Sequence, residues 1–336
     1  MRKSFILVFL SMFFAGFVII RAIIAPSPAL KITTAKHPNA GERIGDKDST
    51  FTYKNIQGAL LGTRFESFDE LKVQVKIYYF DDDIKTIFYP QTRPMAFLVH
   101  EAETQRVVSK LSSGITEKDI IRARDGGFWD KAYLAFHSPY FVWNRWDILR
   151  VFIFSRRRGQ IFGAGDVAFY DLAEHMMRNI TKEDSLSLPA KDFTEKGFIN
   201  TFNHLSSQAF MTSLFSEEMA NFIAVIHERA SMPELITGEF TEEQINDLAF
   251  GALDNYVDII NNEWGQELGK ILQKKYQIDS HTKWTPLLLA NYLNDLQSYY
   301  SWSLQVGFYP FKPTDEIVIR FTNKLNRVME KVKGMS

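Results

Sequence analysis

The sequence predicts an α+β protein with an N-terminal membrane anchor helix, a mixed α+β region and a mostly α-helical C-terminal domain. Three observations predict this class: an apolar N-terminal run that is long enough to cross a bilayer, an early segment with the period of a strand, and apolar residues at helical spacing further on. We divide the chain into an anchor (1–24), a linker (25–50), an α+β region (51–185) and a helical domain (193–336).

Composition limits the functions that this chain of 336 residues can have. Its formal net charge of −1 provides no positive field to collect phosphates, so we expect no nucleic-acid partner. The chain has no cysteine, which excludes disulfides, thiolate metal ligands and a cysteine nucleophile. Hydrophobic residues make up 46% of the chain, which is enough for a sizeable core.

The N-terminus carries a membrane signal. Arg2 and Lys3 precede an apolar run over residues 5–24 in which Arg21 is the one charged residue. About 20 residues in a helix cross the hydrocarbon layer, so we expect residues 5–24 to hold the chain in the lipid bilayer as a single span. A signal peptide that is cleaved is the alternative, and the protein would then be secreted.

Positive residues on both flanks of the run bear on its orientation. Arg2 and Lys3 favour a cytoplasmic N-terminus, whereas Arg21, Lys31 and Lys36 on the other flank oppose it by simple count. The likeness of the N-terminus to an export signal favours the first orientation. We therefore expect an inner-membrane protein whose bulk lies in the periplasm.

The linker and the α+β region show contrasting patterns. Residues 25–50 hold three prolines and no apolar periodicity, which is typical of a connecting segment. Apolar and polar residues alternate over 71–79, which predicts a half-buried strand, and 95–100 form a second apolar run. A helix is then expected between Thr116 as its N-cap and Gly126 at its end.

An aromatic-rich segment follows at residues 128–154, with three tryptophans. The charges within it argue against a second membrane span, and a core helix or an interfacial helix fits better. Arg156–Arg158 come next, in the order of a juxtamembrane basic cluster, although a solvated surface is the simpler interpretation. Asp166 is the expected N-cap of a helix that runs to Asn179.

Helical spacing gathers polar residues in the C-terminal domain. Asn200, His204 and Gln208 recur at every fourth residue and so share one helix face. The next helix ends with His227 and Glu228. A third helix carries a polar stripe with a carboxylate, two amides and two glycines: Asp258, Asn261, Asn262, Gly265 and Gly269.

The stripe predicts close packing and a shared polar centre. A glycine inside a helix costs roughly 1 kcal/mol against alanine, so Gly265 and Gly269 indicate the close approach of another backbone or a ligand. Each buried amide group without a partner costs about 1–3 kcal/mol. We therefore expect the three helices to satisfy one another's polar groups at a common centre.

These residues resemble a bacterial family of small helical domains of unknown function, often found at the C-termini of secreted and toxin-like proteins. The shared order is N-x-F-x-H, then H-E, then D-x-x-N-N-x-x-G-x-x-x-G, within residues 193–275. It is carried here by Asn200, Phe202, His204, His227, Glu228, Asp258, Asn261, Asn262, Gly265 and Gly269. Asn203 stands where the family commonly has arginine, which argues against an anion site. The resemblance implies no established reaction.

Three interpretations of the polar centre remain open. In the first, a divalent metal such as Zn, Mn or Fe binds to His204, His227 and Asp258, with Glu228 in the same set of donors and a position open for water. In the second, His204 is a base that Glu228 or Asp258 orients, without a metal. In the third, a buried hydrogen-bond network fixes the helix register. The expected binding residues are Asn200, Asn261 and Asn262.

Two functions follow from these interpretations. The first is a membrane-anchored bacterial cell-envelope protein whose helical domain is a structural or interaction module, with other envelope proteins as partners. The alternative is a metal-dependent or acid/base hydrolase that uses His204, Glu228 and Asp258. The chain has no complete catalytic motif, such as a G-x-S-x-G elbow, which favours the first function. The concentration of titratable residues at one centre favours the second.

Overall fold

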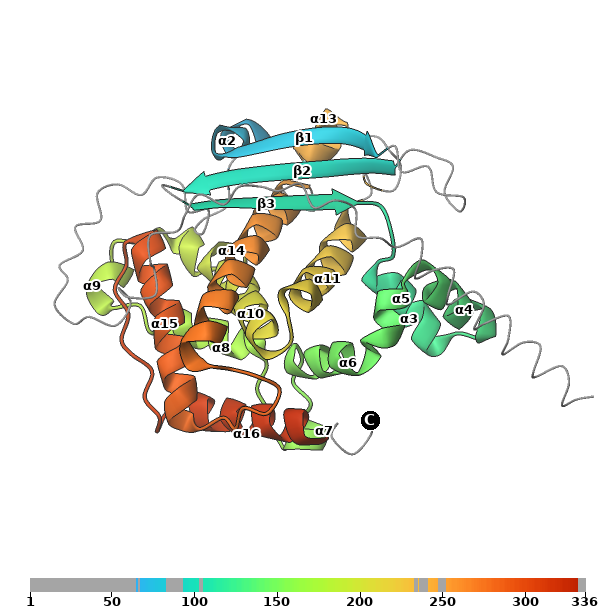
Figure 1. Cartoon of the computed structure of the whole chain (residues 1–336). Coiled ribbons are helices and arrows are strands. Elements are labelled where there is room, and N and C mark those ends of the chain that lie inside the picture. Colours follow the sequence, from blue (N-terminus) through green and yellow to red (C-terminus); the bar gives the residue numbers. More distant parts are fainter. Residues whose placement is uncertain are drawn as a thin grey trace, which may run out of the picture. The chain divides into compact units, whose positions relative to one another are not determined.

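The computed structural model describes residues 65, 67–82, 93–102, 105–232, 235, 241–246 and 252–331. They belong to one compact unit that spans residues 41–336. The fold is α+β, with a helical bulk and one three-stranded sheet (Figure 1). The predicted anchor and linker lie outside the described residues. Within the described part of the chain, no helix is long and apolar enough to cross a membrane.

The sheet is antiparallel, with the strand order β1-β2-β3. β1 (Val75–Asp82) pairs with β2 (Arg93–Ala102), which pairs with β3 (Gln105–Ser112). The second apolar run predicted from the sequence is therefore confirmed as a strand. Alternate residues of each strand face the core, among them Val75, Ala96, Leu98, Val107 and Leu111.

A helix replaces the first half of the strand that we predict over 71–79. α2 (Phe68–Gln74) precedes β1, and Ser67 caps it by accepting a hydrogen bond from the backbone N–H of Glu70 at 3.1 Å. Leu71 is buried on the inner face of this helix. The alternating apolar and polar residues form a strand only from β1 onward. Before β1, the Ser67 cap and the burial of Leu71 favour a helix over the predicted strand.

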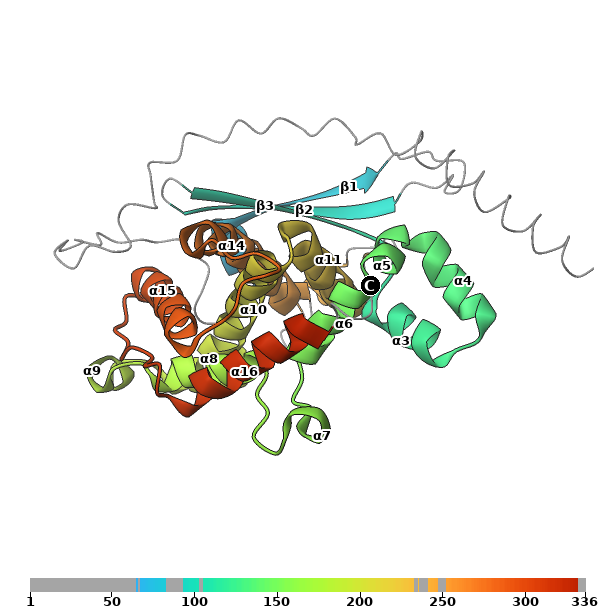
Figure 2. The same ribbon diagram turned by 60° about the horizontal axis from the view of Figure 1, so that its bottom comes forward.

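Short helices follow the sheet (Figures 1 and 2). The helix predicted between Thr116 and Gly126 is confirmed as α3, with Thr116 as its N-cap and Gly126 as its C-cap. The helices of this part of the chain are α3 (Glu117–Asp125), α4 (Phe128–His137), α5 (Pro139–Trp143), α6 (Arg145–Phe154), α7 (Gly159–Phe162), α8 (Phe169–Arg178) and α9 (Lys182–Ser185).

Asp166 does not cap α8, so this prediction was wrong. The helix begins at Phe169, and Asp171 supplies the cap by accepting a hydrogen bond from the backbone N–H of Ala168 at 2.7 Å. Asp166 instead forms a buried ion pair with Lys324, 3.0 Å away, and Lys324 also donates to two backbone carbonyls. The ammonium group is thereby satisfied, which makes this buried pair tolerable.

Longer helices form the rest of the fold, and α14 contacts β3 on one face of the sheet (Figure 1). Short turns connect them: a 3-10 turn (Ala190–Phe193), a π turn (Glu195–Ile199), a second 3-10 turn (Arg229–Ser231) and α13 (Glu242–Ile245). The longer helices are α10 (Asn200–Leu214), α11 (Glu217–Glu228), α14 (Ala252–Tyr276), α15 (Pro286–Leu304) and α16 (Glu316–Lys331).

One hydrophobic core joins the strands to the helices. It contains Leu98 of β2, Phe210 of α10 and Ile260 of α14, all fully buried. The boundary that we predict between residues 51–185 and 193–336 therefore falls within one core and one compact unit. α14 contacts β3, α10 and α11, and the three helices α10, α11 and α14 carry the site described next.

Candidate functional site

α10 and α14 pair through a ladder of polar side chains. Side chains four residues apart on α10 meet side chains four residues apart on α14, and each partner lies 58 residues further along the chain. The constant offset means that the two helices run in the same direction in one register. The pairs are Asn200 with Asp258 at 2.9 Å, His204 with Asn262 at 3.0 Å, and Gln208 with Gln266 at 3.2 Å.

Gly265 and Gly269 allow the two helices to approach closely. A Cβ atom on Gly265 would lie 2.6 Å from the carbonyl oxygen of Leu205, and one on Gly269 would lie 2.7 Å from that of Ala209. Both distances are shorter than a van der Waals contact, so neither position has room for a side chain. The predicted close approach of another backbone is confirmed.

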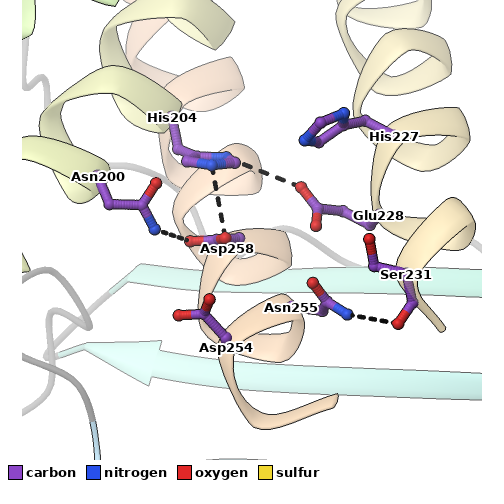
Figure 3. A pocket seen from close by; sticks show the side chains of 8 residues that line it. All are labelled: Asn200, His204, His227, Glu228, Ser231, Asp254, Asn255 and Asp258. Atoms are coloured by element: carbon purple, nitrogen blue, oxygen red, sulfur yellow. Dashed lines mark hydrogen bonds and ion pairs between the residues drawn. The ribbon is translucent and has the colours of Figure 1, made fainter. Parts of the chain in front are cut away.

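Three titratable side chains from three helices converge at the start of the ladder (Figure 3). His204 of α10, Glu228 of α11 and Asp258 of α14 each offer one ligand atom, and these atoms all lie within 4.8 Å of one another. The His204 Nε2 atom is 3.4 Å from Asp258 Oδ2, and its Nδ1 atom is 3.8 Å from Glu228 Oε1. This group could hold a metal ion.

The cluster forms part of the wall of a cavity of about 280 Å³. Every lining residue is polar or charged, and the His204 side chain retains 14% exposure, so water reaches the cluster. The lining residues are Asn200, His204, His227, Glu228, Ser231, Asp254, Asn255 and Asp258 (Figure 3).

Asn262 determines the tautomer of His204. Its Nδ2 atom donates to Glu228 Oε1 at 3.1 Å, so its amide oxygen faces the Nδ1 atom of His204. An amide oxygen only accepts, and Nδ1 must therefore carry a proton and donate it. The Nε2 atom then faces the Asp258 carboxylate, 3.4 Å from Asp258 Oδ2. A metal ion bound between this nitrogen and the carboxylate would be held by both.

The surroundings of the Glu228 carboxyl group disfavour its ionised form. Burial, and to a smaller extent the negative charge of Asp258, together raise its pKa to about 7. His204, His227 and a hydrogen bond from Asn262 act in the opposite direction without cancelling the effect of burial. A metal cation next to Glu228 would favour its ionised form.

His227 lines the cavity but interacts with a different carboxylate. Its Nδ1 atom lies 3.2 Å from Glu117 Oε2, and its side chain is 62% exposed. The hydrogen bond to Glu117 raises the pKa of His227 to about 9, and the same bond lowers the pKa of Glu117. An imidazolium has no free lone pair for a metal. The third candidate metal ligand beside His204 and Asp258 is therefore Glu228, and not His227 as the sequence predicts.

The other predicted binding residues differ in their positions. Asn200 lines the cavity and donates to Asp258, while Asn262 supports the cluster from behind. Asn261 is fully buried outside the cavity lining, and its two amide atoms have no hydrogen-bond partner among the described residues. The geometry therefore gives its predicted binding role no support.

Several residues that contribute to the site are not predicted from the sequence. Asp254 precedes Asp258 by one helical turn, so the helical period would have revealed it. Asn255, three residues before Asp258 on the same helix, follows the same period, whereas Ser231 shows no such pattern. Glu117 is 110 residues away from His227 in the sequence, and no local signal connects the two.

Comparison of the chain with protein-family models, with curated proteins and with solved structures gave no match. The resemblance of residues 193–275 to a helical domain family therefore stays a prediction.

Proposed function

We propose that the chain is a metal-dependent hydrolase whose divalent ion binds to His204, Glu228 and Asp258. The observation that carries the proposal is the convergence of these three ligand atoms at the wall of a polar cavity. One imidazole and two carboxylates suit Zn, Mn or Fe. Three protein ligands also leave coordination positions for water and substrate, as catalytic sites do and closed structural sites do not.

Residues behind the ligands support a positioned metal site. Asn200 donates to one oxygen of Asp258, and Asn262 contacts both of the other ligands. Such partners orient ligands and fix the histidine tautomer, and their loss typically costs about 10–100-fold in metal affinity or activity. The Nδ1 proton of His204 leaves Nε2 as the nitrogen that would bind the ion.

A divalent ion bound there would supply an activated water and polarise the bond to be cleaved, for which an ester or a phosphoester is the candidate. The chain's own groups would bind the polar substrate. The side chains of Asn200, Ser231 and Asn255 provide amide and hydroxyl groups at the cavity wall. The protonated His227 adds a positive charge beside the carboxylates.

We also propose that the hydrolase is tethered to the inner membrane through residues 5–24, with its bulk in the periplasm. The apolar run and its basic start support this location. Cell fractionation tests it. Full-length chain that remains in the membrane pellet after alkaline extraction is expected, whereas a shorter, soluble product would indicate cleavage and secretion.

A structural or interaction module is the second candidate, and the ladder favours it. The pair formed by Gln208 and Gln266 continues the ladder with two unreactive amides and lies outside the cavity lining. A register-fixing role explains this pair and the glycines. It does not require a histidine between two carboxylates at the wall of a cavity that water reaches.

Metal-dependent hydrolysis distinguishes the two candidates. The full chain, purified in detergent and stripped with a chelator, is supplied with Zn²⁺, Mn²⁺ or Fe²⁺ and assayed with a nitrophenyl ester and a nitrophenyl phosphodiester. We expect activity that requires the metal, is lost in Asp258→Asn and is retained in Asp279→Asn, a carboxylate of an exposed loop. Activity without a metal, or no activity with any of these metals, contradicts the proposal.

A further inference from the structure

Exposed hydrophobic side chains gather on the short helices that follow the sheet. Sixteen large hydrophobic side chains are exposed among the described residues, and eight of them lie between residues 121 and 149. We call these eight the aromatic surface: Ile121, Phe128, Trp129, Tyr133, Phe136, Trp143, Trp146 and Leu149. Soluble surfaces rarely concentrate large apolar side chains in this way without an interaction partner.

α4 presents an apolar stripe to the solvent. Trp129, Tyr133 and Phe136 follow one another at helical spacing on one face, with exposures of 81%, 42% and 59%. Leu134 lies on another side of the helix and is buried in a small core with Ile120. Packing therefore uses the smaller apolar side of α4 and leaves its aromatic side outside.

The aromatic surface lies apart from the cavity. In both views α4 is at the outer edge of the helices, with α3 and α5 between it and α11 (Figures 1 and 2). None of the eight side chains lines the cavity. α3 joins the two regions, since its Glu117 contacts the cavity residue His227 and its Ile121 belongs to the aromatic surface.

Basic residues accompany the aromatic surface. Residues 117–158 contain nine Lys or Arg and five Asp or Glu, a net charge of +4, of which Arg156–Arg158 at the end contribute +3. Arg156 pairs with Glu117, and Arg157 pairs with Asp171. The Arg122 guanidinium lies over the Tyr133 ring at 5.4 Å, and that of Arg145 lies over the Trp146 ring at 5.3 Å. Two arginines therefore lie within the aromatic surface and three more follow it, where they can meet an anionic surface.

We propose that the aromatic surface binds to an anionic lipid bilayer, with its tryptophan and phenylalanine side chains inserted at the level of the headgroups. Tryptophan and tyrosine favour this layer because their rings have an apolar body and a polar edge. Arginine and lysine add attraction to anionic lipids. Two copies of this positive segment would repel each other, so its charge favours lipid over a second copy. The contact adds to the predicted span at 5–24 and does not depend on the metal.

A single fluorescent label tests this contact in the full chain. Because the chain has no cysteine, one introduced cysteine carries a bimane label at one position. The labelled chain is reconstituted in vesicles of phosphatidylcholine and phosphatidylglycerol whose acyl chains are brominated and quench nearby bimane. Phe136→Cys probes α4, and Leu287→Cys on α15 is the matched control, because both native side chains are 59% exposed.

We expect bimane emission to be lost at position 136 and to persist at position 287. Ala132→Cys, which keeps every aromatic side chain, should also lose emission, and the added charge reversals Lys131→Glu and Arg145→Glu should restore it. Equal emission at positions 132 and 287 in brominated vesicles overturns the proposal. Emission at position 132 that changes with protein concentration in detergent also overturns it, because a second copy would then cover the aromatic surface.

Discussion

Asn262 is the residue on which the geometry of the candidate metal site depends most. Its amide donates to Glu228 and accepts from His204, so one side chain sets the position of one ligand and the tautomer of another. The adjacent Asn261 is also buried, yet its amide atoms have no hydrogen-bond partner among the described residues. Two neighbouring asparagines thus have opposite energetic roles.

This difference predicts opposite results for two substitutions. Asn262→Ala is expected to weaken Zn²⁺ binding by about 10–100-fold, because His204 loses the acceptor that fixes its tautomer. Asn261→Leu is expected to leave Zn²⁺ affinity unchanged and to preserve or increase stability, because it removes amide groups whose desolvation no hydrogen bond offsets. Calorimetric titration of the metal-free chain measures the affinity. Equal affinities in the two variants would remove Asn262 from the site.

The sequence predicts part of the cluster, because helical spacing reveals which polar residues share a helix face. His204, Glu228 and Asp258 are all among the residues that the sequence predicts at the polar centre. The sequence could not assign His227, whose partner Glu117 comes from α3 and lies 110 residues earlier. Such long-range ion pairs leave no local pattern, so the exchange of His227 for Glu228 in the cluster became visible only in three dimensions.

At the scale of elements, the contact between α10 and α14 holds the site together. Asn200, His204 and Asp258 can meet only while the two helices keep their register and their short separation. The two glycines of α14 set that separation, since a side chain at either position would collide with the backbone of α10. Metal affinity and helix packing are therefore linked.

Gly265→Ala is expected to destabilise the protein by about 1–3 kcal/mol, as overpacking does in tight cores. The new Cβ would meet the Leu205 carbonyl oxygen at 2.6 Å and the Gln208 Cβ at 2.7 Å. Gly127→Ala is the control, because nothing lies within 4 Å of a Cβ there. Urea unfolding measures both variants. A stable Gly265→Ala variant with unchanged metal affinity would show that the separation of the helices is not critical.

The ends of helices and strands are predicted correctly where local capping residues determine them. The predictions are wrong where contacts with distant residues compete with the local pattern. Thr116 and Gly126 mark the ends of α3 as expected. Leu71 belongs to an alternating pattern but is buried in a helix that Ser67 caps. Aspartate is a favoured N-cap residue, but Asp166 forms an ion pair with the buried Lys324. The ion-pair partner lies 158 residues away, beyond the reach of local sequence patterns.

At the scale of the whole molecule, buried carboxyl groups govern the expected response to pH. Burial raises the pKa of both Glu228 and Glu263 to about 7. In the unfolded chain such groups titrate near 4.5, so the folded state binds their protons more tightly. The stabilisation of the folded state by this proton binding is complete below the pKa that these groups have in the unfolded chain. It is lost as the pH rises through their pKa in the folded protein.

The metal-free protein is therefore expected to lose stability between pH values of about 5 and about 8, with Glu228 contributing up to about 3 kcal/mol. Glu228→Gln should flatten this dependence and abolish stabilisation by Zn²⁺. Glu263→Gln should flatten it comparably and keep the stabilisation by Zn²⁺, because Glu263 is not one of the three ligands. Thermal unfolding across this pH range, with and without Zn²⁺, measures both effects. Zn²⁺ stabilisation that survives Glu228→Gln would contradict this assignment.

The most direct measurement of the metal site is the amount of metal bound per chain. The full chain in detergent, with His204→Ala and the exposed-loop control His281→Ala, is dialysed against Zn²⁺ or Mn²⁺ and analysed by elemental mass spectrometry. We predict about one ion per chain in the native protein and in His281→Ala, and none in His204→Ala. Equal metal content in the native protein and His204→Ala would contradict the metal site and leave the cluster as a network that holds three helices in register.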